Sequence, residues 1–191
     1  MNIKARIVAR KMVLTYLYEK YTSHAIAEND HILKEICDID ITNSALEQKD
    51  EMDTQTLAKS LNETFTQKWY DADMTYIAKN CFEKWSENGI DADYIDTMIV
   101  AYDKYADKLP DLINAYASTF RYEDMDIMDR VIFLLWYAEF KLMKTPKEVI
   151  LNETIELAKK YGDQWSPKLI NWILHKVITA EEDVQKDGGS K

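Results

Sequence analysis

The fold class is indicated most clearly by two adjoining stretches, VIFLLWYAEFKLM at residues 131–143 and TPKEVILNETIELAKK at residues 145–160. The first is apolar almost all the way round a helix, which predicts the central buried helix of the protein. The second opens with Thr145, Pro146 and Glu148, which suit the N-cap, N1 and N3 positions of a capping box. Both stretches therefore predict α-helices.

Helical patterning continues on both sides of this pair. Ser166-Pro167 is expected to cap a last helix, whose core face carries Ile170, Ile173, Leu174 and Val177. A first helix is expected from about Asn2 to Tyr21, and its apolar residues fall on two faces, which predicts packing on two sides. No strand alternation of useful length is present, so the predicted fold is all-α.

Glycine is scarce, with four in 191 residues, two of them near the C-terminus. A dinucleotide fingerprint, a Walker loop and a nucleophile elbow each need closely spaced glycines, because the backbone there adopts positive φ or approaches a ligand closely. The sequence therefore excludes the common nucleotide-binding and hydrolase sites. We expect a protein that is not an enzyme.

Metal-binding patterns are incomplete. The three histidines, His24, His31 and His175, form no helical pair of metal ligands. Glu28 and His31 match one half of a di-iron site, but the second Glu-x-x-His unit is missing. The Asp-x-Asp pairs lack the further oxygen ligands of a calcium loop. We therefore expect no metal and no cofactor.

The cysteine count and the hydropathy bear on the cellular compartment. Two cysteines without a CxxC spacing are typical of a reducing interior. No apolar run approaches the ~18 residues of a membrane span, and the first residues lack the apolar core of a secretory signal. These features predict a cytoplasmic protein that does not bind membranes.

Charge is distributed unevenly along the chain. The net charge is −10, but residues 1–21 contain five cations against one acid, so the remainder carries −14. Nine acids face two lysines between Glu28 and Asp53. We interpret residues 22–89 as a partly helical acidic insertion in a single domain over 1–180, followed by a disordered polar tail over 181–191. The basic first helix is suited to the phosphates of single-stranded RNA.

Two parts of the chain resemble the NusB family. ARKMVLTYLY at residues 9–18 is similar to the opening helix of that family, in which an Ala-Arg pair precedes a Leu-Tyr. VILNETIELAK at 149–159 resembles its most recognisable signature, and the start of its central helix and of its final helix resemble MDRVI at 128–132 and SPKLIN at 166–171. The resemblance covers roughly residues 5–21 and 90–180. It implies a compact multi-helix NusB-like bundle.

The resemblance also implies a function, in transcription antitermination. NusB proteins pair with the ribosomal protein NusE and bind boxA elements of nascent, single-stranded RNA, which connects them indirectly to the RNA polymerase elongation complex. By position, the resemblance implies RNA contacts at Lys4, Arg6, Arg10, Lys11, Lys168 and Leu169. It implies NusE contacts at Tyr18 and Asp129.

Alternatives remain at the level of the sequence. Arg10 lies within an apolar stripe, so an internal ion pair competes with an RNA contact there. The family's central-helix arginine corresponds to Leu134, and the glycine after its last-helix asparagine corresponds to Trp172. A divergent protein-interaction module that has lost RNA binding is the alternative function, supported by the acidic remainder of the chain. A third is a stand-alone relative of the RNA-binding domain of some rRNA methyltransferases.

Overall fold

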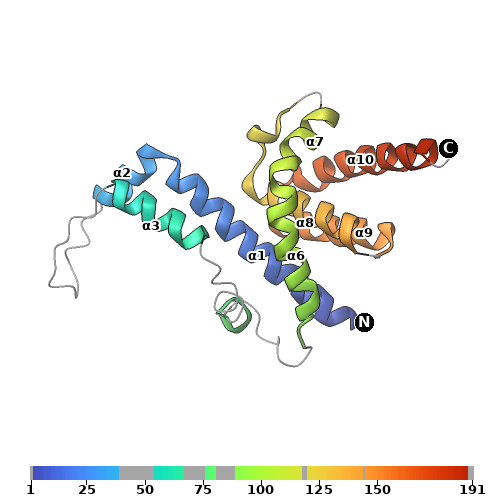
Figure 1. Ribbon diagram of the computed structural model, residues 1–191, viewed down its shortest axis with the longest axis horizontal. Coiled ribbons are helices and arrows are strands. Elements are labelled where there is room, and N and C mark those ends of the chain that lie inside the picture. Colours follow the sequence, from blue (N-terminus) through green and yellow to red (C-terminus); the bar gives the residue numbers. More distant parts are fainter. Residues whose placement is uncertain are drawn as a thin grey trace. The chain divides into compact units, whose positions relative to one another are not determined.

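Helices are the regular secondary structure of the residues that the computed structural model describes, which are 2–38, 54–66, 76–80, 89–117, 120–143 and 145–188 (Figure 1). The all-α prediction is therefore confirmed for this part of the chain. The longer helices are α1 (Ile3–Ala27), α2 (Asp30–Asp38), α3 (Thr54–Thr66), α6 (Ala92–Tyr105), α7 (Leu109–Tyr116), α8 (Ile127–Leu142), α9 (Lys147–Tyr161) and α10 (Ser166–Gly188). Two short 3-10 helices are η2 (Ala106–Lys108) and η3 (Tyr122–Asp124).

The chain divides into two compact units. The first unit comprises Met1–Leu14 with Lys84–Lys191, and the second comprises Thr15–Glu83. The second unit thus takes in most of the predicted insertion at 22–89, of which 39–53, 67–75 and 81–88 lie outside the described residues. Within it, α2 and α3 pack against each other. The single domain over 1–180 and its acidic insertion stay a prediction.

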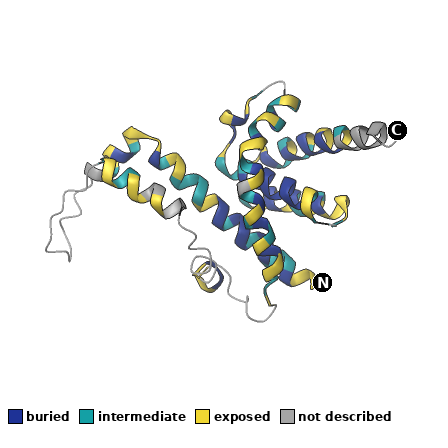
Figure 2. Ribbon diagram, viewed as in Figure 1, coloured by how far each residue is buried: buried dark blue, intermediate teal, exposed yellow. Residues whose placement is uncertain are grey.

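The core of the first unit forms around α8. Every residue from Val131 to Ala138 is buried, as the nearly uniform apolar pattern predicts. α8 packs against α6, α9 and α10, and α7 packs against α10 (Figure 1). From Ser166 to Ala180, α10 instead alternates between buried and exposed residues, because only one of its faces is apolar there (Figure 2). This arrangement confirms α8 as the central buried helix.

The predicted capping box at the start of α9 is wrong. The helix begins at Lys147, its N-cap is Pro146, and no side chain caps it. Pro146 has φ −55° and ψ 137°, which is an extended conformation rather than the first helical position. The helix therefore starts one residue later than predicted, and Thr145 lies too far back along the chain to reach the N3 amide.

The start of α10 also differs from the prediction. Ser166 is the first helical residue rather than the cap. The capping group is Asp163, whose Oδ1 accepts hydrogen bonds from the backbone N of Trp165 at 2.6 Å and of Ser166 at 2.8 Å. The side chain of Ser166 is buried. Its hydroxyl has a hydrogen-bond partner there, because it donates to Asp163 Oδ1.

Both terminal helices are longer than the sequence pattern indicates. α1 continues to Ala27, past the expected end at Tyr21. α10 continues to Gly188, into the segment 181–191 that the sequence predicts as a disordered tail. Side chains beyond Ala180 and residues 189–191 lie outside the described part, so the character of the tail stays a prediction. None of the described helices combines the length and apolarity that a membrane crossing requires.

Candidate nucleic-acid interface

A buried ion pair connects α1 to α8. The Arg10 guanidinium donates from Nε to Glu139 Oε2 at 2.9 Å and from its Nη2 to Glu139 Oε1 at 2.6 Å, a bidentate geometry. Both side chains are almost fully buried. Arg10 Nη1 also lies 3.4 Å from Glu153 Oε2 on α9. The internal pairing that competed with an RNA contact for Arg10 is therefore present.

Tyr94 on α6 completes this cluster. Its hydroxyl donates to Glu139 Oε2 at 2.9 Å, and the Arg6 and Arg10 guanidinium carbons lie 4.5 and 5.9 Å from the centre of its ring. Arg6 donates from Nε to Asp91 Oδ2 at 2.7 Å, so the N-cap of α6 is also bonded to α1. Two of the predicted RNA-contacting cations thus have acidic partners within the first unit.

The pKa values of this cluster follow from its burial and charge. Burial opposes the charged form of Arg10, but the hydrogen bonds and negative charge of Glu139 outweigh it, so the pKa of Arg10 lies above its ordinary value. Burial and the charge of Glu139 raise the pKa of Tyr94 well above its ordinary value. The arginine is therefore charged and the tyrosine neutral at physiological pH, which lets Tyr94 act as a donor to Glu139.

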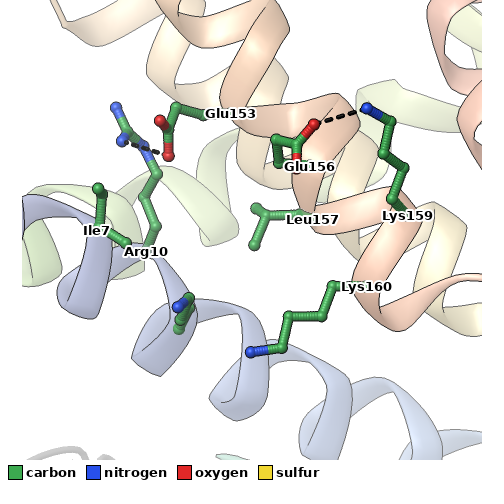
Figure 3. Close-up of a pocket in the computed structure, with 8 residues that line it drawn as sticks. Ile7, Arg10, Glu153, Glu156, Leu157, Lys159 and Lys160 are labelled. Carbon is green, nitrogen blue, oxygen red and sulfur yellow. Dashed lines mark hydrogen bonds and ion pairs between the residues drawn. The ribbon is translucent and has the colours of Figure 1, made fainter.

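A groove opens beside this cluster, between α1 and α9. It has a volume of about 330 Å³. The close-up in Figure 3 shows Lys160 extending from α9 toward α1, and Glu156 paired with Lys159 at 2.6 Å. The lining residues are Ile7, Arg10 and Lys11 from α1 and Glu153, Glu156, Leu157, Lys159 and Lys160 from α9. Four cations against two acids give this groove a net positive charge in a chain of net charge −10.

The groove unites part of the predicted RNA set and adds to it. Lys11 is half-buried in the groove wall, whereas Lys4 is exposed near the start of α1. Sequence reasoning missed Lys159 and Lys160, which stand in the last turn of α9. The only sequence feature that could have indicated them was the Lys-Lys pair. That pair is not specific, because cations are common in the last turn of a helix, where they interact favourably with the helix dipole.

The other predicted RNA residues lie at the start of α10. Lys168 is exposed, and its Nζ lies 5.3 Å from the centre of the Trp165 ring. Leu169 is half-buried. The structure thus brings Arg10 and Lys11 together in the groove and places Lys168 and Leu169 on a different helix.

The two predicted NusE contacts differ in accessibility. Tyr18 is 39% exposed, whereas Asp129 is 4% exposed and its Oδ1 has no hydrogen-bond partner. Burial raises the pKa of Asp129, the negative charges of Asp126 and Asp163 act in the same direction, and a hydrogen bond with Ser166 offsets part of the effect. Asp129 therefore faces the start of α10 rather than solvent.

Within the described residues, no group of three or more His, Cys, Asp or Glu side chains is arranged to hold a metal ion. His24 and His31 instead lie 3.3 and 3.4 Å from Glu28 and Glu35, one helical turn away. These are exposed side-chain pairs.

The fold and the groove define an all-helical protein with a central buried helix and a basic surface groove in an otherwise acidic chain. The chain belongs to the NusB family, whose family model matches residues 67–179, more than half of the sequence. The match takes in residues 67–89, part of the segment that the sequence resemblance left unaligned, and it does not include α1.

Similar proteins carry the same family name. The chain is 32% identical over 85 residues to the transcription antitermination protein NusB of Fusobacterium nucleatum, covering 44% of this chain and 56% of that protein. It is 30% identical over 91 residues to the protein of that name from Streptomyces griseus, covering 47% and 64%. A third, from Clostridium botulinum, is 32% identical over 98 residues, covering 51% and 70%. The chain thus spans less than two thirds of the first two relatives.

Proposed function

We propose that this protein acts in transcription antitermination, as a non-catalytic cytoplasmic adaptor that binds single-stranded boxA-type RNA together with NusE. It would reach the RNA polymerase elongation complex indirectly, through that RNA. The observation that carries the proposal is the positive groove between α1 and α9 in a chain of net charge −10. Membership of the NusB family, whose relatives bear the antitermination name, supports it.

The charge of the groove favours an anionic ligand. Lys11 from α1 and Lys160 from α9 supply cations from opposite walls, and Lys4 adds an exposed cation near the start of α1. Lysines that neutralise phosphates release bound counterions, which drives the association of proteins with nucleic acids. Ile7 and Leu157 add apolar surface between these cations, which suits the faces of unpaired bases.

Arg6 and Arg10 have a positioning role in this proposal. Their guanidinium groups hold α1 against α6, α8 and α9 through Asp91, Glu139 and Glu153. Their charge is therefore largely compensated by these carboxylates, and their role in the proposal is to hold α1 beside the groove. The same observation favours the alternative function, an interaction module that has lost RNA binding, because fewer cations of α1 remain for phosphates.

Two residues are assigned to the NusE side. Tyr18 offers a partly exposed aromatic ring, a residue type enriched at protein interfaces. Asp129 is assigned an indirect role, since its carboxyl group is covered and interacts with Ser166 at the start of α10. The acidic remainder of the chain complements a basic ribosomal protein.

The test replaces one lysine in each groove wall. In Lys11→Ala/Lys160→Ala, the plot of log affinity for boxA-type RNA against log salt should flatten by about 1.4, since each phosphate contact contributes ~0.7 for single strands. The matched control is Lys104→Ala/Lys108→Ala, which removes two exposed lysines of the first unit that do not line the groove and should retain the wild-type slope.

The same preparations distinguish the two functions. NusE capture without RNA should be unaffected in Lys11→Ala/Lys160→Ala and weakened in Tyr18→Ala, because these residues serve different partners. If wild-type protein captures NusE but binds boxA-type RNA no better than an unrelated acidic protein does, the interaction-module alternative replaces our proposal. Equal salt slopes for the groove and control variants would show that RNA does not occupy the groove.

A further inference from the structure

A buried carboxyl group lies where the start of α10 meets α8. Asp129, in the first turn of α8, is 4% exposed, and its Oδ1 has no hydrogen-bond partner among the described residues. A buried carboxylate needs a cation or several donors beside it, because an ionised group loses its hydration on burial. Asp129 instead interacts with Ser166, the buried first residue of α10. These surroundings are poorly suited to a negative charge.

The charged groups that act on Asp129 from the two helix starts are acidic. Asp126 is the N-cap of α8 and Asp163 caps α10, and the negative charge of each opposes ionisation of Asp129. The cations of these helix starts interact elsewhere. The Arg130 guanidinium donates to two backbone oxygens of the preceding loop at 2.9 and 2.7 Å, and the exposed Lys168 lies over an indole ring. Asp129 therefore has like charges nearby and, in the described part of the chain, no ion-pair partner.

The Ser166 hydroxyl has one proton for two carboxyl groups. Ser166 Oγ donates to Asp163 Oδ1 at 3.1 Å and accepts a hydrogen bond from the backbone N of Asp163 at 3.0 Å. A hydroxyl donates only once, so it cannot donate to Asp129 at the same time. If Asp129 carries a proton, it donates to Ser166 Oγ, and both carboxyl groups are bonded to the serine. If Asp129 is ionised, only one of the two carboxylates can receive the hydroxyl proton.

We propose that Asp129 is a proton switch at the junction of α8 and α10, and that its protonation decides which carboxyl group the Ser166 hydroxyl serves. In the protonated state, Asp129 donates to Ser166 and Ser166 donates to Asp163, so a continuous chain of hydrogen bonds joins α8 to the cap of α10. In the ionised state, the hydroxyl turns to Asp129, and Asp163 keeps only its two backbone amides. The switch concerns how these helices are held together and does not depend on RNA binding.

The expected pH dependence has a definite sign. Burial raises the pKa of Asp129 above its ordinary value, and the charges of Asp126 and Asp163 act in the same direction. When folding raises the pKa of a carboxyl group, its proton stabilises the folded protein at low pH, and this stabilisation is lost as pH rises through the folded-state pKa. The start of α10 should therefore be held more firmly below that pH than above it.

The direct test is an NMR titration of the side-chain carboxyl carbons in the 191-residue chain. The midpoint of Asp129 should lie above 3.8, its ordinary value. At the pH of that midpoint, the Asp163 carboxyl and Ser166 Cβ resonances should shift as well, because the hydroxyl changes its acceptor. In Asp129→Asn this shift should disappear, since the asparagine amide donates to Ser166 at every pH.

Two conservative variants test the part of the neighbouring charges. Asp126→Asn removes one like charge and keeps an oxygen that can cap α8, so the midpoint of Asp129 should fall toward its ordinary value. Asp124→Asn is the matched control, because it neutralises an exposed acid of η3 that is not among the charges acting on Asp129. It should leave the midpoint of Asp129 unchanged.

Urea unfolding across pH gives the effect on stability. Asp129→Asn should unfold at the same urea concentration as the wild type in acid, and at a higher one above the folded-state pKa of Asp129. A wild-type Asp129 midpoint at or below 3.8 would overturn the switch, as would a response of Ser166 and Asp163 that persists in Asp129→Asn. A urea difference that is the same at every pH would overturn it too. None of these measurements uses RNA or NusE, so this test and the groove test fail independently.

Discussion

At the scale of single residues, Arg10 joins the helices of the first unit. Its guanidinium contacts Glu139 on α8 and Glu153 on α9, and it lies beside the Tyr94 ring on α6. A buried charge without a partner is costly, whereas this pair satisfies most of its donors and acceptors inside the protein. The pair therefore specifies how α1 lies against the other helices, and so sets one wall of the groove.

Removing one partner of this pair should be far more harmful than neutralising both. Arg10→Met leaves the Glu139 carboxylate buried without its cation and should lower the free energy of unfolding by about 3–5 kcal/mol. Arg10→Met/Glu139→Gln should recover a large part of that loss, because glutamine is neutral and still accepts the Tyr94 hydrogen bond. Urea unfolding of both variants measures the difference. Equal losses in the two would show that charge burial is not the cause.

At the scale of helices, one carboxylate defines the start of α10. Asp163 Oδ1 accepts hydrogen bonds from two backbone amides and from the Ser166 hydroxyl, which lies 3.1 Å away. These backbone hydrogen bonds hold the pKa of Asp163 below its ordinary value. α9 has no comparable side-chain cap, so its start depends on packing of the helix rather than on a single polar group.

Asp163→Ala should therefore lower the urea midpoint, and Thr145→Ala should leave it nearly unchanged. The Asp163 effect should depend on pH with a definite sign. Since the pKa in the folded state lies below the ordinary value of 3.8, the stabilisation is present above that value and is lost as pH falls through the folded-state pKa. Unfolding of wild type and Asp163→Ala across acidic pH tests this. A midpoint difference that persists when Asp163 is protonated would contradict it.

At the scale of the whole molecule, charge is segregated along the chain. The groove between α1 and α9 is lined by four cations and two acids, while the segment from Glu28 to Asp53 carries nine acids and two lysines. Such a segment buries little apolar surface, so the sequence predicts that it contributes least to the stability of the protein.

Limited digestion with a protease of broad specificity should therefore cut first within residues 22–53. Fragments that contain residues 90–180 should persist, because α6, α8, α9 and α10 share a buried core there. Mass spectrometry of the earliest fragments identifies the sites. First cleavage inside 128–178 would refute the proposed division of the chain.

The amino-acid sequence was sufficient for the fold class, for the existence of the central helix and for the core face of the last helix. The central helix was expected at 131–143, and α8 runs from Ile127 to Leu142. These depend on the spacing of apolar residues, which is a local property that each helix expresses wherever it packs. The resemblance of residues 149–159 to the NusB signature was equally readable, because it lies in consecutive positions.

The partners of Arg6 and Arg10 and the role of the α9 lysines required the tertiary structure. Arg10 and Glu139 are 129 positions apart in the sequence, so no local pattern predicts their contact. The apolar residues around Arg10 were compatible with its side chain pointing either into the protein or toward RNA. Lys11 and Lys160 line one groove because α1 and α9 flank it, which no spacing along either helix expresses. The residues at which α9 and α10 begin also required the tertiary structure. Threonine is a residue type that caps helices, but the extended backbone of Pro146 makes Pro146 the N-cap and places Thr145 one residue before it. A cap therefore depends on backbone geometry as well as on residue type.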